Sequence, residues 1–296
     1  MFTFFKKLLL VLLPFGCIAQ QDLNRCWDVD YSLYPREINV STRNGKFNQI
    51  ESATQRPVAR LHGLTERDVT FSKRVWSQVD LKQKQNHLLY YPLKPKPNKW
   101  SLWTVIRYSL EVDMSLTAFS TNGLEQDDSF KYPIHPADSN YCEMMEDILF
   151  RTEFVDSLDE NGEAIYDTLT ESYVQKEVRN PIESEDIIRY IIKEDWFFDN
   201  QRSTMEKRII GLAPVVNVYD EFGDVKGVQT LFWLYFPECE YVFQAYAAQI
   251  RDFEPKVLTY TDVFRKRMFN TVIYQESSSG GDPLHKRNSS KEALLE

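Results

Sequence analysis

The clearest apolar pattern in the sequence lies between about residues 208 and 236. Two runs rich in β-branched and aromatic residues, 208–219 and 228–236, are separated by the acidic connection DEFGDVKG. Asp220 can bond its own backbone and Gly223 accepts a positive φ, so this connection suits a turn between two strands. Both faces of 228–236 are largely apolar, which predicts a strand inside a sheet that is covered on both sides. We therefore expect a long β-hairpin at the centre of the fold.

Four other segments have apolar residues at helical spacing, and three of them have capping residues near their starts. The predicted helices are 66–80, 184–192, 240–253 and 260–272. Segment 101–110 fits a helix or a strand, and a short helix is favoured because the strand-like SLTAFS follows it. Together these elements predict an α+β fold, with a mainly antiparallel sheet centred on the 208–236 hairpin and helices packed on its faces.

The N-terminus has the pattern of a secretory signal peptide over residues 1–19, with cleavage after Ala19. An acylated Cys17, as in a lipoprotein, is the alternative. We expect an extended N-terminal arm at 20–60 and a single α+β domain at 61–275. Within that domain, 124–180 is predicted to be an acidic surface excursion. The Ser/Gly/charge-rich segment 276–296 is predicted to be a disordered tail.

Composition narrows the class of protein. The chain is 43% hydrophobic and 14% aromatic, which supports a packed core, and its net charge of −9 makes a nucleic-acid partner unexpected. The apolar run of the signal peptide is too short to span a bilayer, and no other apolar run is long enough. Three cysteines follow the signal peptide, so at most one pair can form. We expect Cys142 and Cys239 to act as small core residues.

No catalytic, cofactor or metal motif is present. The four histidines are scattered, and glycine-rich nucleotide cradles and a Gly-x-Ser-x-Gly elbow are absent. The most site-like cluster is Glu194, Asp195 and Asp199, which flanks three aromatic residues. This cluster is the basis of an alternative function, in which the chain is an exported carbohydrate-active or ligand-binding protein. The favoured interpretation is structural.

In that interpretation the segment is a turn whose aromatic residues point into the core. Asp195 and Asp199 then cap the backbone and pair with Arg202 or Lys207.

Four stretches carry a resemblance to a known family. They are RDVTFSKRVWSQVDLKQKQNHLLYYP, KEDWFFDNQRSTMEKRIIGLAPV, LFWLYFPECEYVF and TYTDVFRKRMFN. In this order they resemble the GldN family of gliding-motility proteins, called PorN in non-gliding relatives, of the type IX secretion machinery. Together they comprise 74 of the 277 residues that follow the signal peptide, roughly a quarter. The resemblance marks six positions as anchors of the core: Trp76, Trp196, Phe197, Phe198, Arg202 and Trp233.

The resemblance implies a non-enzymatic role without a cofactor. Members of this family are soluble periplasmic proteins that assemble with the outer-membrane lipoprotein GldK (PorK) into a ring beneath the outer membrane. The ring also contacts the periplasmic part of the motor protein GldM (PorM), and it supports protein secretion and gliding. Because a ring repeats one head-to-tail contact, we expect segments 20–60 or 124–180 to contribute to contacts with neighbouring copies or with GldK.

Overall fold

The computed structural model describes most of the chain after residue 67 and a few residues before it. The described residues are 56–59, 61, 63, 68–97, 99–121, 127–157, 162–167, 172–220, 223–249, 257–277 and 283–284. The expected signal peptide, nearly all of the expected N-terminal arm and most of the expected tail lie outside these residues.

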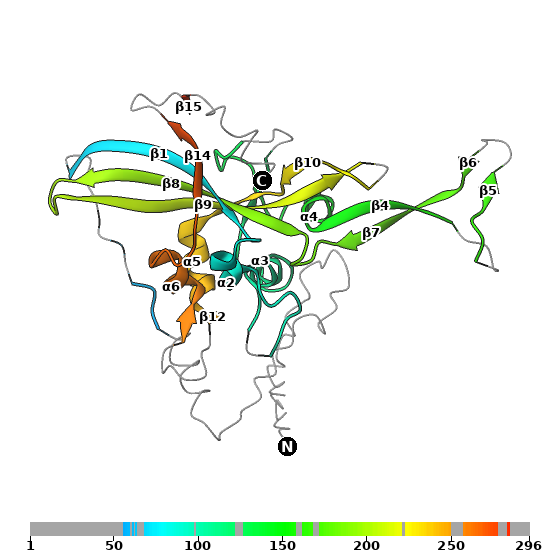
Figure 1. Ribbon diagram of the computed structural model, residues 1–296, viewed down its shortest axis with the longest axis horizontal. Helices are drawn as coiled ribbons and strands as arrows, with labels where there is room; N and C mark the ends of the chain where they lie inside the picture. Colours follow the sequence, from blue (N-terminus) through cyan, green and yellow to red (C-terminus); the bar gives the residue numbers. More distant parts are fainter. Residues whose placement is uncertain are drawn as a thin grey trace, which may run out of the picture.

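A nine-stranded sheet forms the centre of the molecule (Figure 1). Its strand order is β15-β14-β1-β8-β9-β11-β2-β3, and β10 also pairs with β9. The bounds are Val69–Asp80 (β1), Ala118–Phe119 (β2), Pro133–Ile134 (β3), Ile187–Asp199 (β8), Thr204–Tyr219 (β9), Val225–Thr230 (β10), Trp233–Tyr235 (β11), Val272–Ser277 (β14) and Pro283–Leu284 (β15). Every pairing is antiparallel. The predicted α+β class with a mainly antiparallel sheet is therefore confirmed.

The predicted hairpin is present beside a longer one. β9 pairs with β10 and then with β11, from Val225↔Tyr219 to Tyr235↔Gly211. The connection includes Gly223, which has the positive φ that its turn requires. A second hairpin joins β8 to β9 and pairs over twelve positions. The centre of the sheet is thus a three-stranded unit of β1, β8 and β9.

The expectation that 228–236 is covered on both sides is wrong for its first half. β10 pairs only with β9, and Val225 and Val228 are 57% and 44% exposed. β11 lies between β9 and β2, and its Trp233 and Leu234 are buried. The apolar run therefore divides at residues 231–232 into an exposed edge strand and a buried inner strand.

Two of the predicted helices are strands instead. Segment 66–80 contains β1, in which Val75, Ser77 and Val79 are buried and their neighbours are not, the period of a strand. Segment 184–192 leads into β8, which also takes in the expected turn at 193–199. Isoleucine and valine lose little freedom in an extended chain, and each strand has hydrogen-bonded partners on both sides. These contributions favour the strand over the helix that the spacing of the apolar residues predicted.

The helices gather mainly on one side of the sheet, where Figure 1 shows α2, α3, α5 and α6. Their bounds are Lys84–Asn86 (η3), His87–Tyr90 (α2), Leu102–Glu111 (α3), Tyr141–Leu149 (α4), Phe236–Gln244 (α5) and Tyr260–Arg265 (α6). The short helix expected at 101–110 is confirmed as α3. It begins where the Ser101 hydroxyl accepts a hydrogen bond from the Thr104 N–H at 3.1 Å.

The two remaining helices are shorter than predicted. After α5 the chain turns into β12 (Ala247–Gln249), which pairs with β13 (Leu258–Thr259). Helix α6 begins with the predicted capping box between Thr259 and Asp262, but it ends at Arg265. β14 then takes up 272–277 and extends into the expected tail.

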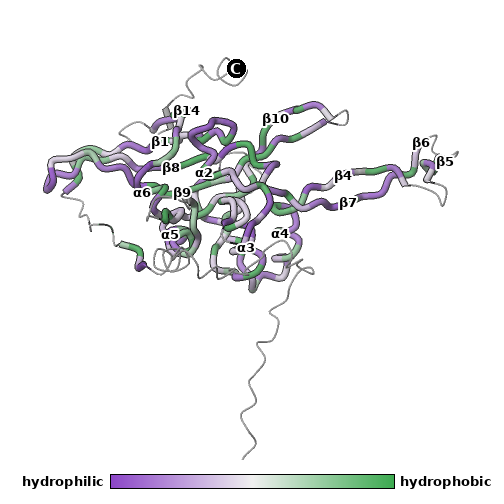
Figure 2. Tube along the Cα trace, turned by 60° about the horizontal axis from the view of Figure 1, so that its bottom comes forward, coloured by the Kyte–Doolittle hydropathy of each residue, from purple (hydrophilic) through white to green (hydrophobic). Residues whose placement is uncertain are grey.

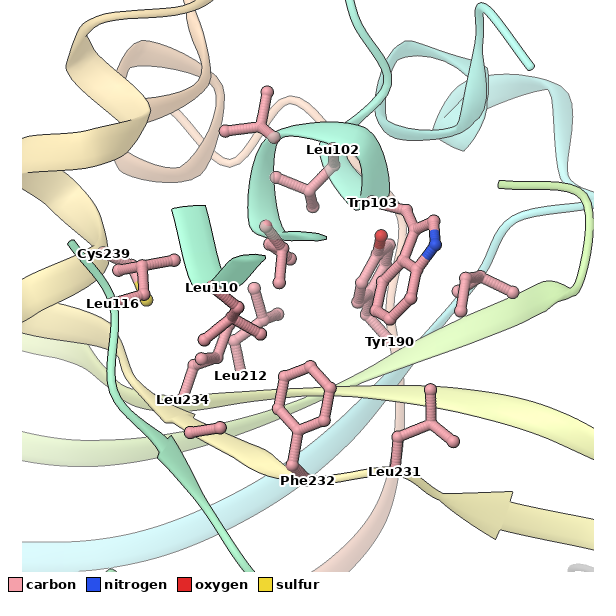
Figure 3. Close-up of a cluster of buried hydrophobic side chains, with 14 of the residues drawn as sticks. Leu102, Trp103, Leu110, Leu116, Tyr190, Leu212, Leu231, Phe232, Leu234 and Cys239 are labelled. Atoms are coloured by element: carbon pink, nitrogen blue, oxygen red, sulfur yellow. The ribbon is translucent and has the colours of Figure 1, made fainter. Parts of the chain in front are cut away.

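The main core lies between α3 and the sheet. All ten residues of α3 are buried. Figure 3 shows three of them facing side chains from β8, β9, β11 and the residues before β11: Leu102, Trp103 and Leu110 against Tyr190, Leu212, Leu231, Phe232 and Leu234. A second group of rings joins α5 to α6, where Phe243 and Phe264 stack with centroids 5.7 Å apart.

A two-stranded ribbon projects from this body. β4 (Phe150–Asp156) and β7 (Gln175–Pro181) pair at seven positions as a sheet of their own. β5 (Tyr166–Asp167) and β6 (Ser172–Tyr173) pair at its far end. Figures 1 and 2 both show the ribbon standing clear of the helices and the main sheet.

The expected surface excursion at 124–180 therefore divides into two parts. Tyr141, Met145 and Leu149 of α4 belong to the buried core, and β3 joins the edge of the main sheet. Only the described residues of 150–181 project, and we refer to them as the ribbon.

Candidate functional site

The acidic residues of 194–199 point to different parts of the molecule. Glu194 is 1% exposed. Its carboxylate accepts hydrogen bonds from the Arg267 guanidinium at 2.6 Å and from the Trp196 indole N–H at 2.7 Å. The residue thereby ties β8 to the loop that follows α6. A buried carboxylate that is paired and hydrogen-bonded in this way is a structural group.

Asp195 lies on the opposite face of β8, because successive side chains of a strand alternate. Both of its oxygens accept hydrogen bonds from Arg74, its direct partner on β1, at 2.7 and 3.0 Å. These hydrogen bonds, more than the burial that opposes them, raise the pKa of Arg74. The prediction that Asp195 pairs with Arg202 or Lys207 is wrong. Lys207 instead lies over the ring of Trp196, 3.7 Å from its centroid.

Asp199 closes the turn between β8 and β9. Its Oδ1 accepts hydrogen bonds from the backbone N–H groups of Gln201 (2.8 Å) and Arg202 (3.3 Å), and its Oδ2 lies 4.0 Å from the Arg202 Nε. The predicted capping role and the pairing with Arg202 are thus both observed. Glu194, Asp195 and Asp199 occupy two faces and an end of β8, so they cannot act together as an acid and base pair on one substrate.

The structure does bring together a polar cluster that sequence reasoning missed. Lys193 is 4% exposed and lies between Trp76 on β1 and Gly211 on β9. Its ammonium group donates to the backbone oxygen of Asp128 at 2.7 Å and lies 3.0 Å from its carboxylate. The same carboxylate accepts from the Trp76 indole N–H at 2.6 Å. Burial lowers the pKa of Lys193, and Asp128 opposes this shift.

Phe130 covers the centre of this cluster. A Cβ atom at Gly211 would lie 2.7 Å from the Phe130 ring and 3.1 Å from Trp233. The ring also lies 5.0 Å from the Lys193 ammonium group. Phe130 holds a φ of 55°, which is uncommon for a bulky residue. The cluster therefore fastens segment 127–132 to the face of the sheet that lies opposite α3. Gly211 leaves the space that the ring fills.

The six expected core anchors differ in burial. Phe197 and Trp233 are 5% and 3% exposed, whereas Trp76, Trp196 and Phe198 are half-buried. Arg202 lies outside the core, at the β8–β9 turn, and pairs with Glu206 at 2.8 Å. In the sequence, Gly211 was the available signal for the missed cluster, because a glycine inside a long strand often marks the close approach of another group.

Other candidate chemistry is limited in the part of the chain that the structure describes. No group of three or more His, Cys, Asp or Glu residues is placed to hold a metal ion there. Cys142 is partly buried against the core and disulfide-bonded, so it is more than the small core residue that was expected, and the limit of one pair still holds. Cys239 is free and buried as expected, and burial raises the pKa of its thiol. None of the described helices combines the length and the apolar character needed to cross a membrane.

These features define an α+β protein. Its most distinctive sequence motif, 193–215, lies in strands β8 and β9 and holds neighbouring segments to the sheet through ion pairs and hydrogen bonds. Comparison with protein families gives the family. The model for "Gliding motility associated protein GldN" matches residues 64–296, and the chain belongs to this family. The resemblance carried by the four stretches, all of which lie within the matched residues, is thereby confirmed. A search of curated proteins finds no match.

Proposed function

We propose that the chain is a non-enzymatic structural subunit of the type IX secretion and gliding-motility machinery. In this role it lies in the periplasm beneath the outer membrane and forms a ring with copies of itself and a GldK (PorK) type lipoprotein. The ring contacts the periplasmic part of a GldM (PorM) type motor protein and supports secretion. The observation that carries the proposal is the family match over 64–296.

The contacts of the family motif support a scaffold role. Glu194, Asp195 and Lys193 are each engaged by a neighbouring side chain or backbone group of the same chain. These contacts join β8 to three other segments. The export pattern of residues 1–19 agrees with a periplasmic location.

A deletion of the gene in its own organism tests the proposal. We expect loss of secretion of proteins that carry the type IX C-terminal signal, and recovery with the wild-type gene. A tagged copy should co-purify with the GldK-type lipoprotein. Normal secretion in the deletion strain, together with no recovery of the lipoprotein, contradicts the proposal.

A second comparison separates this role from the carbohydrate-active alternative. The Asp195→Asn and Asp199→Asn double variant removes two of the three carboxylates that the alternative needs. We expect it to restore secretion in the deletion strain with, at most, a lower thermal stability. Asp195→Asn alone, which leaves the buried Asp199 cap intact, is the control for folding. Loss of secretion in a folded Asp195→Asn protein favours the enzymatic alternative.

A further inference from the structure

We infer that the ribbon tip of one copy docks on a lysine-rich segment of a second copy of the same chain. The tip comprises the described residues 155–157, 162–167 and 172–174, and the lysine segment comprises 82–99. This inference rests on the proposed assembly role, and it specifies the contact between copies.

The ribbon is poorly suited to stand alone. Seven residue pairs extend it by about 24 Å, at roughly 3.4 Å per residue. Its described side chains are exposed or half-buried, and its strands pair only with each other. A two-stranded hairpin of this kind is marginally stable in water by itself. A partner that covers it would add the buried surface that it lacks.

The ribbon tip combines apolar and acidic character. Its exposed large apolar residues, with exposed fractions from 40% to 54%, are Val155, Ile165, Tyr166, Tyr173 and Val174. The rings of Tyr166 and Tyr173 meet edge to face, with centroids 5.3 Å apart. Seven Asp or Glu residues and no Lys or Arg occur between positions 152 and 175. Grouped exposed apolar side chains mark a protein contact, and the charge calls for a basic partner.

The lysine segment has the complementary character. It contains five lysines, and no Asp or Glu occurs between positions 81 and 110. None of the five makes an ion pair within the described part of the chain. Lys96 and Lys99 are held together in a tight turn by two backbone hydrogen bonds of 3.0 and 3.1 Å. The exposed ring of Tyr91 lies in the same segment.

The two lysines of this turn also repel each other. Burial lowers the pKa of Lys99, and the neighbouring Lys96 lowers it further. A carboxylate placed between these two groups would relieve their repulsion. The ribbon tip carries such carboxylates, among them the exposed side chains of Asp156 and Glu163.

The geometry requires two copies. In Figure 1 the tip lies at the far end of the ribbon, whereas α2, which belongs to the lysine segment, lies beneath the middle of the sheet. The tip of a copy therefore does not contact its own lysine segment. A contact between two different surfaces of the same chain is head-to-tail, and its repetition gives a closed ring or an open filament.

Photo-crosslinking in cells tests the contact directly. Tyr166 is replaced by benzoylphenylalanine in the full chain, and Tyr241, which is 71% exposed on α5, serves as the control position. We expect Tyr166, and not Tyr241, to give an adduct with the mass of two chains. Mass spectrometry should place the second attachment within 82–99. No two-chain adduct, or one attached elsewhere on the second copy, overturns the inference, as do adducts only with the lipoprotein.

Charge exchange tests the complementarity. Lys94→Glu with Lys96→Glu, or Asp156→Lys with Glu163→Lys, should each reduce the Tyr166 adduct by about tenfold or more, because like charges then meet. All four substitutions in one chain should restore the adduct. Lys226→Glu and Glu238→Lys, at exposed positions of β10 and α5, should leave it unchanged. Equal adduct yields in all variants overturn the inference.

The same strains separate this inference from the proposed function. If the lipoprotein co-purifies and secretion depends on the chain, but no adduct between copies forms, the contact is wrong and the assembly role stands. If the lipoprotein does not co-purify and secretion is normal without the chain, the proposed function fails, whatever the adducts show.

Discussion

At the scale of single residues, Gly211 allows the Phe130 ring to pack directly on the sheet because it has no side chain. Gly211 lies in the middle of β9, where any side chain would point at Phe130 and Trp233. We expect Gly211→Ala to lower the free energy of unfolding by about 1–3 kcal/mol through overpacking. Urea denaturation measures this change. In a Phe130→Ala background the cost should fall, because the nearest clash is gone.

Gly227→Ala is the matched control for this substitution. Gly227 also lies in a strand of the same sheet, but a Cβ there would meet no atom within 4 Å. We expect a change in the free energy of unfolding of less than about 1 kcal/mol, since only the unfolded chain is affected. Equal losses at Gly211 and Gly227 would show that the Phe130 contact does not limit position 211.

The neighbouring carboxylates of β8 allow a second comparison. Glu194 is buried with two charged or polar donors, whereas Asp195 pairs with Arg74 in a partly exposed site. We expect Glu194→Gln to cost about 1.5–3 kcal/mol, as for a buried hydrogen bond to a charged group. Asp195→Asn should cost about 0.2–1 kcal/mol, as for an exposed ion pair. Chemical denaturation of both variants measures the two free-energy losses. A larger loss at Asp195 than at Glu194 would contradict the assignment of the stronger stabilising contact to the buried Glu194.

At the scale of elements, β8 shows what the sequence could and could not predict. The run SEDIIRYIIK has a helical start signal and apolar residues three and four apart, so local pattern favoured a helix. Its partners on β1 and β9 lie far away in sequence or beyond a turn, and no local pattern contains them. The 208–236 hairpin was predictable because its two strands are close in sequence. Its second half is buried with the help of β2, a non-local partner, whereas β10 pairs only with β9.

In the candidate site, too, contacts could be predicted only where the partners lie close in sequence. Asp199 was correctly assigned as a cap because its partners lie two and three residues away. Arg74, Arg267 and Asp128, the partners of Asp195, Glu194 and Lys193, come from distant segments and could not be assigned from sequence spacing.

Helix α6 depends on a capping carboxylate whose effect varies with pH. Burial raises the pKa of Asp262, but hydrogen bonds from Lys266, the Thr259 backbone and Arg56 outweigh it, so the pKa lies below its ordinary value. Stability from this group is therefore full above the unfolded pKa of about 3.9 and is lost as pH falls through the lower folded value. We expect Asp262→Asn to cost about 1 kcal/mol at pH 7.

The difference between wild type and Asp262→Asn should begin to shrink below about pH 4, where the carboxylate of the unfolded chain becomes protonated, and should be lost as pH falls through the lower folded pKa. Urea titrations at pH 7 and at acidic pH measure it. Asp224→Asn, at an exposed aspartate, is the control and should give a small difference at both pH values. A difference that grows on acidification would contradict the lowered pKa.

At the scale of the whole molecule, we expect that the ribbon can be removed while the rest of the protein, here called the body, keeps its fold. The body is closed by α3 and the rings of α5 and α6, and none of the described ribbon residues beyond Phe150 belongs to its core. Removal of the whole of 124–180 would also remove α4 and the Asp128 and Phe130 contacts. That larger deletion would therefore not leave a folded monomer, and a narrower excision is required.

Thr152 and Arg179 are direct partners across the ribbon, so residues 153–178 can be replaced by Asn-Gly in a two-residue hairpin turn. The stem contacts of Arg151 with Asp186 and of Arg179 with Glu146 are retained. We expect the shortened chain to unfold cooperatively at nearly the wild-type urea midpoint, because the removed side chains are exposed or half-buried. In cells it should accumulate normally but lose the contact between copies and, with it, secretion. Full secretion by a folded, shortened chain would mean that the ribbon is dispensable for assembly.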